Sequence, residues 1–362
     1  MPSKPPPALA DLRRHAIART FFTPTTLPRA IARLGFVQAD PIRAPARAQD
    51  LTLRQRVAGY RAGDLERRYA ALPIEEDFFV NYGFVPRALH HLMHPRSPRT
   101  AWTRARRAQA EAVLAFVRAR GVAHPREVDN EFAHGKTINW FGGSSNASTQ
   151  LLDEMHYRGL LRVARREGGV RLYAAREALP PPADPRAAHD TLVDAVVAKY
   201  APLPLATLGQ LLSHLGGGVP QWRAGRGAAL QRARARLAHA RIDGVDWYWP
   251  AGERITRGEP PERVRLLAPF DPLVWDRRRF ELFWGWAYRF EAYTPLAQRR
   301  LGYYALPLLW RDAVIGWANT STRAGTLELR CGYVAGRAPR DAAYRRELEA
   351  EVERLRAFLA PR

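Results

Sequence analysis

The chain has 362 residues, 46% of them hydrophobic, and a formal net charge of +22, and its length predicts two or three domains with packed cores. The single cysteine, Cys331, excludes an intrachain disulfide and a thiolate zinc site, and no apolar run is long enough to predict a membrane span. Only three of the 57 basic residues are lysines, so the charge is carried by arginine, whose planar fork suits phosphate oxygens. We therefore expect a nucleic acid or another anionic surface as partner.

The first predicted domain, residues 8–96, contains helices separated by a short extended stretch. The helices are expected at residues 8–19, 26–34, 44–60 and 62–72. Between the second and third, Gln38 and Asp40 stand two residues apart and share a face if the chain is extended there. Asp40 has two possible roles in so basic a chain. It is either a catalytic carboxylate or the cap of a helix or turn that Pro41 continues. On chemistry alone, the turn is the commoner arrangement.

The next two predicted domains, residues 99–175 and 187–250, repeat one plan. In the first, helices at 104–120, 125–133 and 147–161 precede a hairpin of residues 161–164 and 170–174, with Arg165 and Arg166 at its tip. In the second, helices at 191–200, 207–215 and 228–240 precede a short wing at 242–249. Three helices followed by a β-wing are typical of the winged helix, a DNA-binding helix-turn-helix unit. We therefore predict tandem winged helices, with the first domain as a less regular third copy.

The last predicted domain, residues 264–362, has the pattern of a β-rich subdomain. Short strand-like runs separated by turn residues are expected at residues 265–270, 287–294, 303–309, 314–319 and 326–334, and a helix at 340–359 closes the chain. The predicted fold class is therefore α+β, in which tandem winged-helix units precede a C-terminal β-rich subdomain and its closing helix.

Other candidate sites allow more than one interpretation. His90 and His94 have the spacing of metal ligands, but no third ligand is evident, so surface or capping histidines are the simpler explanation and we expect no metal. Asp271 and Asp276 form either a salt-bridged loop or a loop whose following arginines meet a DNA backbone. No phosphate-binding or dinucleotide-binding glycine motif is present, and we expect no cofactor. The aromatic residues near the C-terminus are expected mainly in the core, and a minority could stack on bases.

Four stretches of the chain together resemble one family. They are Gln38-Ala39-Asp40, the loop Trp140-Phe141-Gly142-Gly143, the block from Leu267 to Arg279, and Glu291-Ala292-Tyr293 followed by the block from Arg299 to Pro307. Over nearly its whole length the chain is similar to the YcaQ/AlkZ-type winged-helix DNA glycosylases, the family of interstrand crosslink repair glycosylases. The motif Gln-x-Asp resembles that of the Asp branch of this family.

The resemblance implies a concave DNA-binding channel, excision of N7-alkylated purines and unhooking of interstrand crosslinks. Gln38 and Asp40 are then the catalytic residues, and double-stranded DNA that is alkylated or crosslinked is the partner of a cytoplasmic, nucleoid-associated monomer. The residues expected to bind DNA are Arg43, Arg47, Arg54, Trp140, Arg165, Arg166, Arg277 and Arg278. The chain departs from the family pattern at Ala39, Phe78, Val80 and Trp317, which leaves the substrate range open.

The chemistry of such a lesion fits these residues independently. An N7-alkylguanine is already cationic, so its departure needs no general acid and one carboxylate suffices. That carboxylate can stabilise an oxocarbenium-like sugar and deprotonate a water that Gln38 holds. None of the three lysines neighbours the motif, so we expect a monofunctional glycosylase without a Schiff-base lyase step. The alternatives are a non-catalytic winged-helix regulator, for which Asp40 is dispensable, and a chromatin-like binder that needs only charge.

Overall fold

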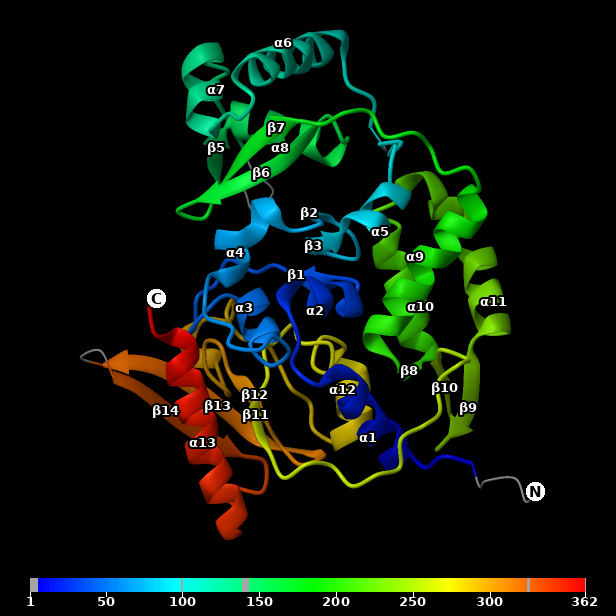
Figure 1. The fold of residues 1–362 in the computed structure, drawn as a ribbon, viewed down its shortest axis with the longest axis vertical. Helices are drawn as coiled ribbons and strands as arrows, with labels where there is room; N and C mark the ends of the chain where they lie inside the picture. Colours follow the sequence, from blue (N-terminus) through cyan, green and yellow to red (C-terminus); the bar gives the residue numbers. More distant parts are fainter. Residues whose placement is uncertain (1–5, 99, 139–142, 324–325, 362) are drawn as a thin grey trace. The chain divides into compact units, whose positions relative to one another are not determined.

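The structure is a computed structural model that describes residues 6–98, 100–138, 143–323 and 326–361. Its residue contacts divide the chain into two compact units that interleave along the sequence (Figure 1). Unit 1 holds residues 1–64, 194–211 and 230–362, and unit 2 holds residues 65–193 and 212–229. The mixture of helices and sheets confirms the predicted α+β class, whereas the boundaries of the four predicted domains stay a prediction. None of the described helices combines the length and apolar character that crossing a bilayer requires.

An antiparallel sheet with the strand order β11-β12-β13-β14 lies in unit 1. Its strands are β11 (Val264–Leu266), β12 (Leu306–Trp310), β13 (Ala313–Arg323) and β14 (Thr326–Tyr333). All five residues of β12 are buried, so this strand belongs to the core on both faces. The C-terminal helix α13 (Ala342–Leu359) contacts β11 and buries Leu355 and Phe358 (Figure 1).

The N-terminal elements of unit 1 are α1 (Leu9–Thr20), α2 (Leu27–Leu34), β1 (Val37–Gln38) and α3 (Ala48–Leu53). The apolar positions of α2 follow the spacing i, i+3, i+4, i+7 and are buried, which makes one side of this helix part of the core. Pro28 lies in its first turn, where the missing N–H costs nothing. Helix α1 packs against α12 (Arg277–Trp284), which brings the N-terminal segment of unit 1 against a segment from its C-terminal part.

The rest of unit 1 contains a second, three-stranded sheet with the order β8-β10-β9. Its strands are β8 (Leu203–Pro204), β9 (Ala238–Ile242) and β10 (Val245–Trp249). Asp243 and Gly244 join β9 to β10 with φ values of 50° and 77°, the left-handed pair that a tight hairpin turn requires. Helices α9 (Pro185–Tyr200), α10 (Leu205–Leu215) and α11 (Arg226–Arg236) have residues in both units, and a 3₁₀ turn lies at Leu296–Gln298.

Unit 2 begins within α4 (Asp64–Arg68) and alternates helices with antiparallel hairpins. Helices α6 (Arg104–Arg120), α7 (Pro125–Phe132) and α8 (Ala147–Tyr157) precede a hairpin of β6 (Leu161–Glu167) and β7 (Val170–Ala175), which confirms the predicted order of three helices and a hairpin in residues 104–175. The other elements of this unit are β2 (Ile74–Phe78), β3 (Tyr82–Pro86), α5 (Arg87–Leu92), β4 (Lys136–Ile138), β5 (Ser144–Asn146) and the 3₁₀ helices Tyr69–Ala71 and Pro220–Gly225.

Several sequence predictions of secondary structure are wrong in detail. Only Ala48–Leu53 of the helix expected at residues 44–60 forms, and Gly59 and Gly63 adopt positive φ values that a helix cannot continue through. The hairpin β2–β3 was not predicted, because its first strand contains three consecutive acidic residues, which are depleted in strands. No strand forms at residues 287–294, helix α12 was missed, and the helix expected at 228–240 ends at Arg236 because β9 follows.

Candidate active site

The stretch that carries Gln38 and Asp40 leaves α2 through a glycine. Gly35 ends this helix with φ 65°, in the left-handed region that L side chains avoid. Phe36 and Val37 follow as fully buried residues, and the chain is extended at Val37–Gln38, which meets the condition for a shared face at Gln38 but ends before Asp40. Gln38 is 7% exposed and Asp40 is 8% exposed, so two hydrogen-bonding side chains stand at the edge of the core of unit 1.

Asp40 lies in a tight turn. Its Oδ1 accepts the N–H of Ile42 at 2.9 Å, and its own N–H donates to Oε1 of Gln49 at 3.1 Å. The turn expected before Pro41 is therefore present, and it engages only one carboxylate oxygen. No described residue donates a hydrogen bond to Oδ2. Burial raises the pKa of Asp40 above its ordinary value, and the Ile42 N–H opposes this rise only in part.

Two buried polar atoms of this region lack a hydrogen-bond partner among the described residues, Oε1 of Gln38 and Oη of Tyr304. Tyr304 is 3% exposed, and its pKa is raised by burial and then by the negative charge of Asp40. Leaving a buried acceptor or donor unsatisfied costs about 1–3 kcal/mol. Such atoms indicate a place where a water or a ligand supplies the missing bond.

Helix α3 supports the turn. Gln49 holds the backbone of Asp40, and the adjacent Asp50 accepts the Tyr60 O–H at 2.6 Å and the Gly63 N–H at 3.1 Å. Sequence reasoning missed Gln49, because nothing in the spacing of nine residues indicates that its amide reaches Asp40.

Two buried ion pairs fix the end of α3 to the C-terminal half of unit 1. Arg54 donates to Oε1 of Glu351 at 2.5 Å, and Glu351 is fully buried on α13. Arg56, also fully buried, pairs with Oδ2 of Asp271 at 2.9 Å and donates to the carbonyls of Thr20 and Thr52. Removing one partner of a buried pair typically costs about 3–5 kcal/mol. The segment that follows the turn at Asp40 is thus tied to residues more than 200 positions away.

One lysine lies beside the motif in space, which contradicts the sequence inference that none neighbours it. Nζ of Lys199 donates to the carbonyl of Phe36 at 2.5 Å, two residues before Gln38. Burial, followed by the charge of Arg56, lowers the pKa of Lys199 to about 7, and Asp271 opposes this shift. The two residues are 163 positions apart, so their contact could not be predicted from sequence distance.

Three of the arginines predicted to bind DNA form contacts within the protein. Arg54 has a side chain only 4% exposed and is paired with Glu351. Arg166 is paired with the buried carboxylate of Glu76 in unit 2. Arg277 donates to the carbonyls of Pro269 and Val274 and lies 4.5 Å from the centre of the Tyr288 ring. These three contacts oppose a role as free phosphate ligands.

The other predicted DNA-binding residues divide into exposed and undescribed ones. Arg43 and Arg278 are exposed, and Arg278 lies in the first turn of α12. Arg165 is 49% exposed and paired with Glu167, and it lies within β6 and not at the tip of the hairpin as predicted, because the strand continues to Glu167. Arg47 is half-buried just before α3. Trp140 lies outside the described residues. Asp276 caps α12 by accepting the Arg278 N–H at 3.0 Å, and Asp271 is ion-paired with Arg56. The salt-bridged interpretation therefore holds for Asp271, and contact of the following arginines with DNA stays a prediction.

A cluster of possible metal ligands lies in unit 2. Nε2 of His90 and Nε2 of His94 lie 2.8 Å and 3.2 Å from Oδ2 of Asp77, so Asp77 is the third member that sequence reasoning did not find. Arg96 donates to the other oxygen of Asp77 at 2.8 Å, and Arg176 donates to Nδ1 of His90. Arginine only donates, so Nδ1 of neutral His90 must accept and its proton resides on Nε2, facing Asp77. A protonated Nε2 cannot ligate a metal, and two adjacent guanidinium groups disfavour a cation. The arrangement favours a hydrogen-bonded network.

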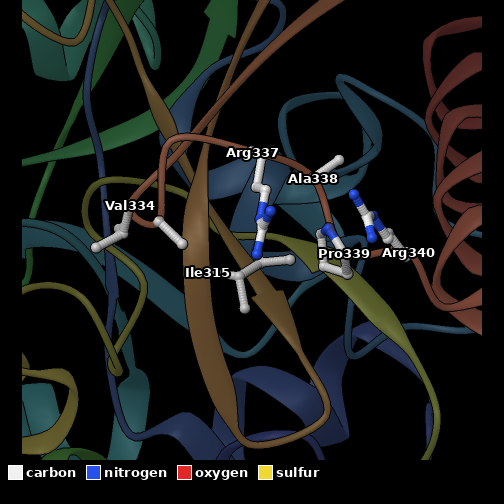
Figure 2. A pocket seen from close by; sticks show the side chains of 7 residues that line it. Ile315, Val334, Arg337, Ala338, Pro339 and Arg340 are labelled. Carbon is white, nitrogen blue, oxygen red and sulfur yellow. The ribbon is translucent and has the colours of Figure 1, made fainter.

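A hollow of 490 Å³ lies elsewhere on unit 1, between Ile315 and the segment Val334–Arg340. Figure 2 shows the side chain of Arg337 reaching toward Ile315, with Val334 and Pro339 on either side. Neither Gln38 nor Asp40 lines it, and it offers arginines and alkyl groups but no carboxylate or nucleophile. This hollow therefore has no evident part in the chemistry of Asp40.

Comparison with known proteins assigns the class. The fold resembles the Streptomyces sahachiroi DNA glycosylase AlkZ, with a TM-score of 0.59 and 16% sequence identity over 97% of this chain and 96% of that chain. The family model described as DNA glycosylase AlkZ-like matches residues 31–358, a range that includes Gln38, Asp40 and the Glu291–Tyr304 segment. The chain belongs to the AlkZ-like family of DNA glycosylases, and it is therefore an enzyme of DNA repair that acts on DNA. This assignment replaces the two non-catalytic alternatives.

Proposed function

We propose that this glycosylase hydrolyses the N-glycosidic bond of N7-alkylated purines, including those in interstrand crosslinks, with Asp40 as the catalytic carboxylate. The observation that carries the proposal is a buried aspartate whose Oδ2 accepts no hydrogen bond from the described residues, two residues along the chain from a buried glutamine whose Oε1 is also unpartnered. Both groups accept hydrogen bonds, and a water molecule between them supplies the two donors that they lack. The similar AlkZ is itself named a DNA glycosylase, and the lesion class is our inference for this chain.

The reaction needs only these two side chains and water. The alkylated purine leaves with the electron pair of its C1′–N9 bond, which neutralises its positive charge, so no acid is required. Asp40 stabilises the positive charge that develops on the sugar, and the oxygen of the water that Gln38 orients bonds to C1′. The proton of that water passes to Asp40 and then to solvent, leaving an abasic site and a neutral base. The raised pKa of Asp40 makes it a better proton acceptor than an exposed aspartate.

We infer that the enzyme is monofunctional, although Lys199 lies near the motif. A lyase step requires an amine that reaches C1′ of the abasic sugar. Nζ of Lys199 is buried, donates to the Phe36 carbonyl and lies 5.5 Å from the centre of the Phe36 ring. Its contacts are those of a group that anchors the backbone before Gln38.

DNA binding is proposed to involve tandem winged helices and exposed arginines. The order of three helices and a hairpin in residues 104–175 supports the first of these units, and Arg43, Arg165 and Arg278 remain exposed. If about six phosphates are neutralised, affinity for duplex DNA falls roughly a thousandfold between 50 and 200 mM salt. Fluorescence anisotropy with an undamaged duplex measures this slope. A flat salt response contradicts the electrostatic picture.

The test of the proposed function uses defined lesions. Purified enzyme, in molar excess, is incubated separately with three duplexes. One contains a single N7-methylguanine, one contains a nitrogen-mustard crosslink, and one is undamaged. Strand breakage after alkali reports each abasic site. We expect breakage at both lesions and none in the control. A wild-type enzyme that releases no base from either lesion contradicts the proposal.

A further inference from the structure

The segment from Glu291 to Tyr304 exposes apolar side chains to an unusual degree. Tyr293 is 79% exposed, Leu296 is 80% exposed and Tyr303 is 44% exposed. Large apolar groups gathered on one short segment are costly in water and commonly mark a binding surface. The family match covers this segment but assigns no role to it.

Hydrogen bonds hold this segment in one conformation. Glu291, which is 5% exposed, accepts the N–H groups of Arg300, Leu301 and Gly302 at 2.9, 2.7 and 3.2 Å. Asn319 donates to the carbonyl of Leu301 at 2.7 Å. Gly302 has φ 118°, and a Cβ there would lie 2.3 Å from the Asn319 side chain, so only glycine fits. A ring presented by such a segment loses little conformational freedom when it binds a ligand.

The two exposed tyrosines differ in what covers their rings. The guanidinium of Arg299 lies 5.0 Å from the centre of the Tyr303 ring, so a cation already occupies that ring. Tyr293 meets Phe290 edge-on, with ring centres 6.1 Å apart, and Phe290 packs against Tyr304 and Phe270. No cation among the described residues covers the face of Tyr293. The ring is therefore supported from one side and open for stacking.

Ring contacts connect Tyr293 to the buried Tyr304, because Phe290 packs against both tyrosines. Tyr304 directly follows the exposed Tyr303, and its hydroxyl has no partner among the described residues. Partial desolvation and then the negative charge of Asp40 raise the pKa of Tyr293, and burial and then the same charge raise the pKa of Tyr304. The exposed ring therefore belongs to an aromatic cluster of unit 1 whose electrostatics Asp40 influences.

We propose that Tyr293 stacks on the alkylated base and recognises its positive charge through the face of the ring. This inference rests on the proposed function, because it is the N7-alkylated purine that brings a cationic π-system next to Asp40. An aromatic face attracts a cation by about 0.5–2 kcal/mol, which corresponds to roughly two- to thirty-fold in affinity. Arg300 on the same segment is exposed, and its positive charge suits the phosphates that flank such a base. A normal guanine is neutral and gains less from the same contact.

The experiment measures binding to DNA that cannot react. A 2′-fluoro sugar disfavours the oxocarbenium-like state, so duplexes with 2′-fluorinated N7-methylguanine and with 2′-fluorinated guanine give affinities for a cationic and a neutral base. We expect wild type to prefer the cationic duplex, Tyr293→Phe to keep this preference, and Tyr293→Leu to lose two- to thirty-fold of it. Tyr303→Leu is the matched control, because its ring is already covered by Arg299. It should behave as wild type.

The outcomes separate this inference from the proposed function. If wild type excises N7-methylguanine, Asp40→Asn does not, and Tyr293→Leu keeps the full preference for the cationic duplex, the inference alone is overturned. If Tyr303→Leu loses the preference as much as Tyr293→Leu, the open face of Tyr293 is not the cause and the inference is again overturned. If wild type shows neither excision nor preference, both fail. Because Tyr293 is exposed, its replacement should leave the melting temperature unchanged, which calorimetry checks.

Discussion

Two buried aspartates, one in each unit, show how differently this chain treats a carboxylate. Asp77 in unit 2 receives hydrogen bonds from His90 and His94 on one oxygen and from Arg96 and the Phe78 N–H on the other. Burial alone would raise its pKa, but Arg96 and the two histidines lower it well below the usual range. Asp40 in unit 1 receives one backbone N–H, and burial raises its pKa.

The comparison shows that two buried carboxylates differ in how far their hydrogen-bonding capacity is satisfied, and in the function we propose the less satisfied one is the reactive one. Each carboxylate oxygen of Asp77 already accepts two hydrogen bonds within the protein, so neither oxygen is available to a substrate. Oδ2 of Asp40 accepts no hydrogen bond from the described residues, and Oε1 of Gln38 is also unpartnered among them. A site that is under-satisfied in the free protein is stabilised when a substrate or water arrives.

The largest effect that this comparison predicts is on stability. Asp77→Asn leaves Arg96 buried without its counter-charge and should lower the free energy of unfolding by about 3–5 kcal/mol. Asp40→Asn should raise it slightly, because the raised pKa of Asp40 means that its carboxylate is less favourable in the folded protein than in the unfolded chain, and the substitution removes this charge. Urea unfolding of both variants measures the difference. Equal losses of unfolding free energy in the two variants would contradict the difference that we infer between Asp77 and Asp40.

A second prediction concerns the pH dependence of stability in unit 2. Burial lowers the pKa of His90 to about 3 and that of His94 to about 4. The hydrogen bonds that these histidines donate to Asp77 oppose both shifts. The unfolded chain therefore binds more protons than the folded one between pH 6.5 and about 4. The contribution of the two neutral histidines to the free energy of unfolding is fully present above pH 6.5 and is lost as the pH falls from 6.5 toward about 4.

Urea midpoints at pH 7.5, 6.0 and 5.0 check this slope. His94→Asn should flatten it, and His91→Gln, a change at an exposed neighbour on α5, should leave it as in wild type. A His94→Asn protein with the full wild-type slope would show that this cluster does not account for the acid sensitivity.

Much of the fold could be predicted from periodicity, and the parts that could not have physical causes. The buried stripe of α2 and the order of α6, α7, α8 and the hairpin β6–β7 follow from local patterns. Strand β2 could not be found, because its buried acids are stable only through partners such as Arg162, Arg166 and Arg96 that come from distant segments. Tertiary ion pairs outweigh strand propensity there.

The residues of the candidate site also divide into those that the sequence could predict and those that it could not. Gln38 and Asp40 could be singled out because they are adjacent in sequence, and the turn at Ile42 follows from the Asp-Pro signal. Gln49, Tyr304 and Lys199 could not be, because each reaches the motif only through the tertiary fold. Arg54 illustrates the reverse error, since composition presented it as a DNA ligand and the fold pairs it with Glu351.

A smaller effect sharpens the role of Lys199. We expect borohydride to trap no covalent complex between wild-type enzyme and abasic DNA, because the amine is buried and bonded to Phe36. Lys199→Met should reduce excision only modestly by loosening the backbone before Gln38. Gel analysis of the trapping reaction decides the matter, and a trapped species that disappears in Lys199→Met would establish a lyase step instead.

The most direct measurement is single-turnover excision of N7-methylguanine by Asp40→Asn. The variant keeps the shape of the side chain and removes its charge, so the rate should fall by a factor of about 100 or more, while duplex DNA binds as well as to wild type or slightly tighter. Gln38→Ala should lose less, because it removes neutral hydrogen bonds. Asp50→Asn, a buried neighbour that accepts from Tyr60 and Gly63, serves as the control and should retain its activity per folded molecule. Wild-type excision by Asp40→Asn, with an inactive Asp50→Asn, would contradict the assignment of Asp40.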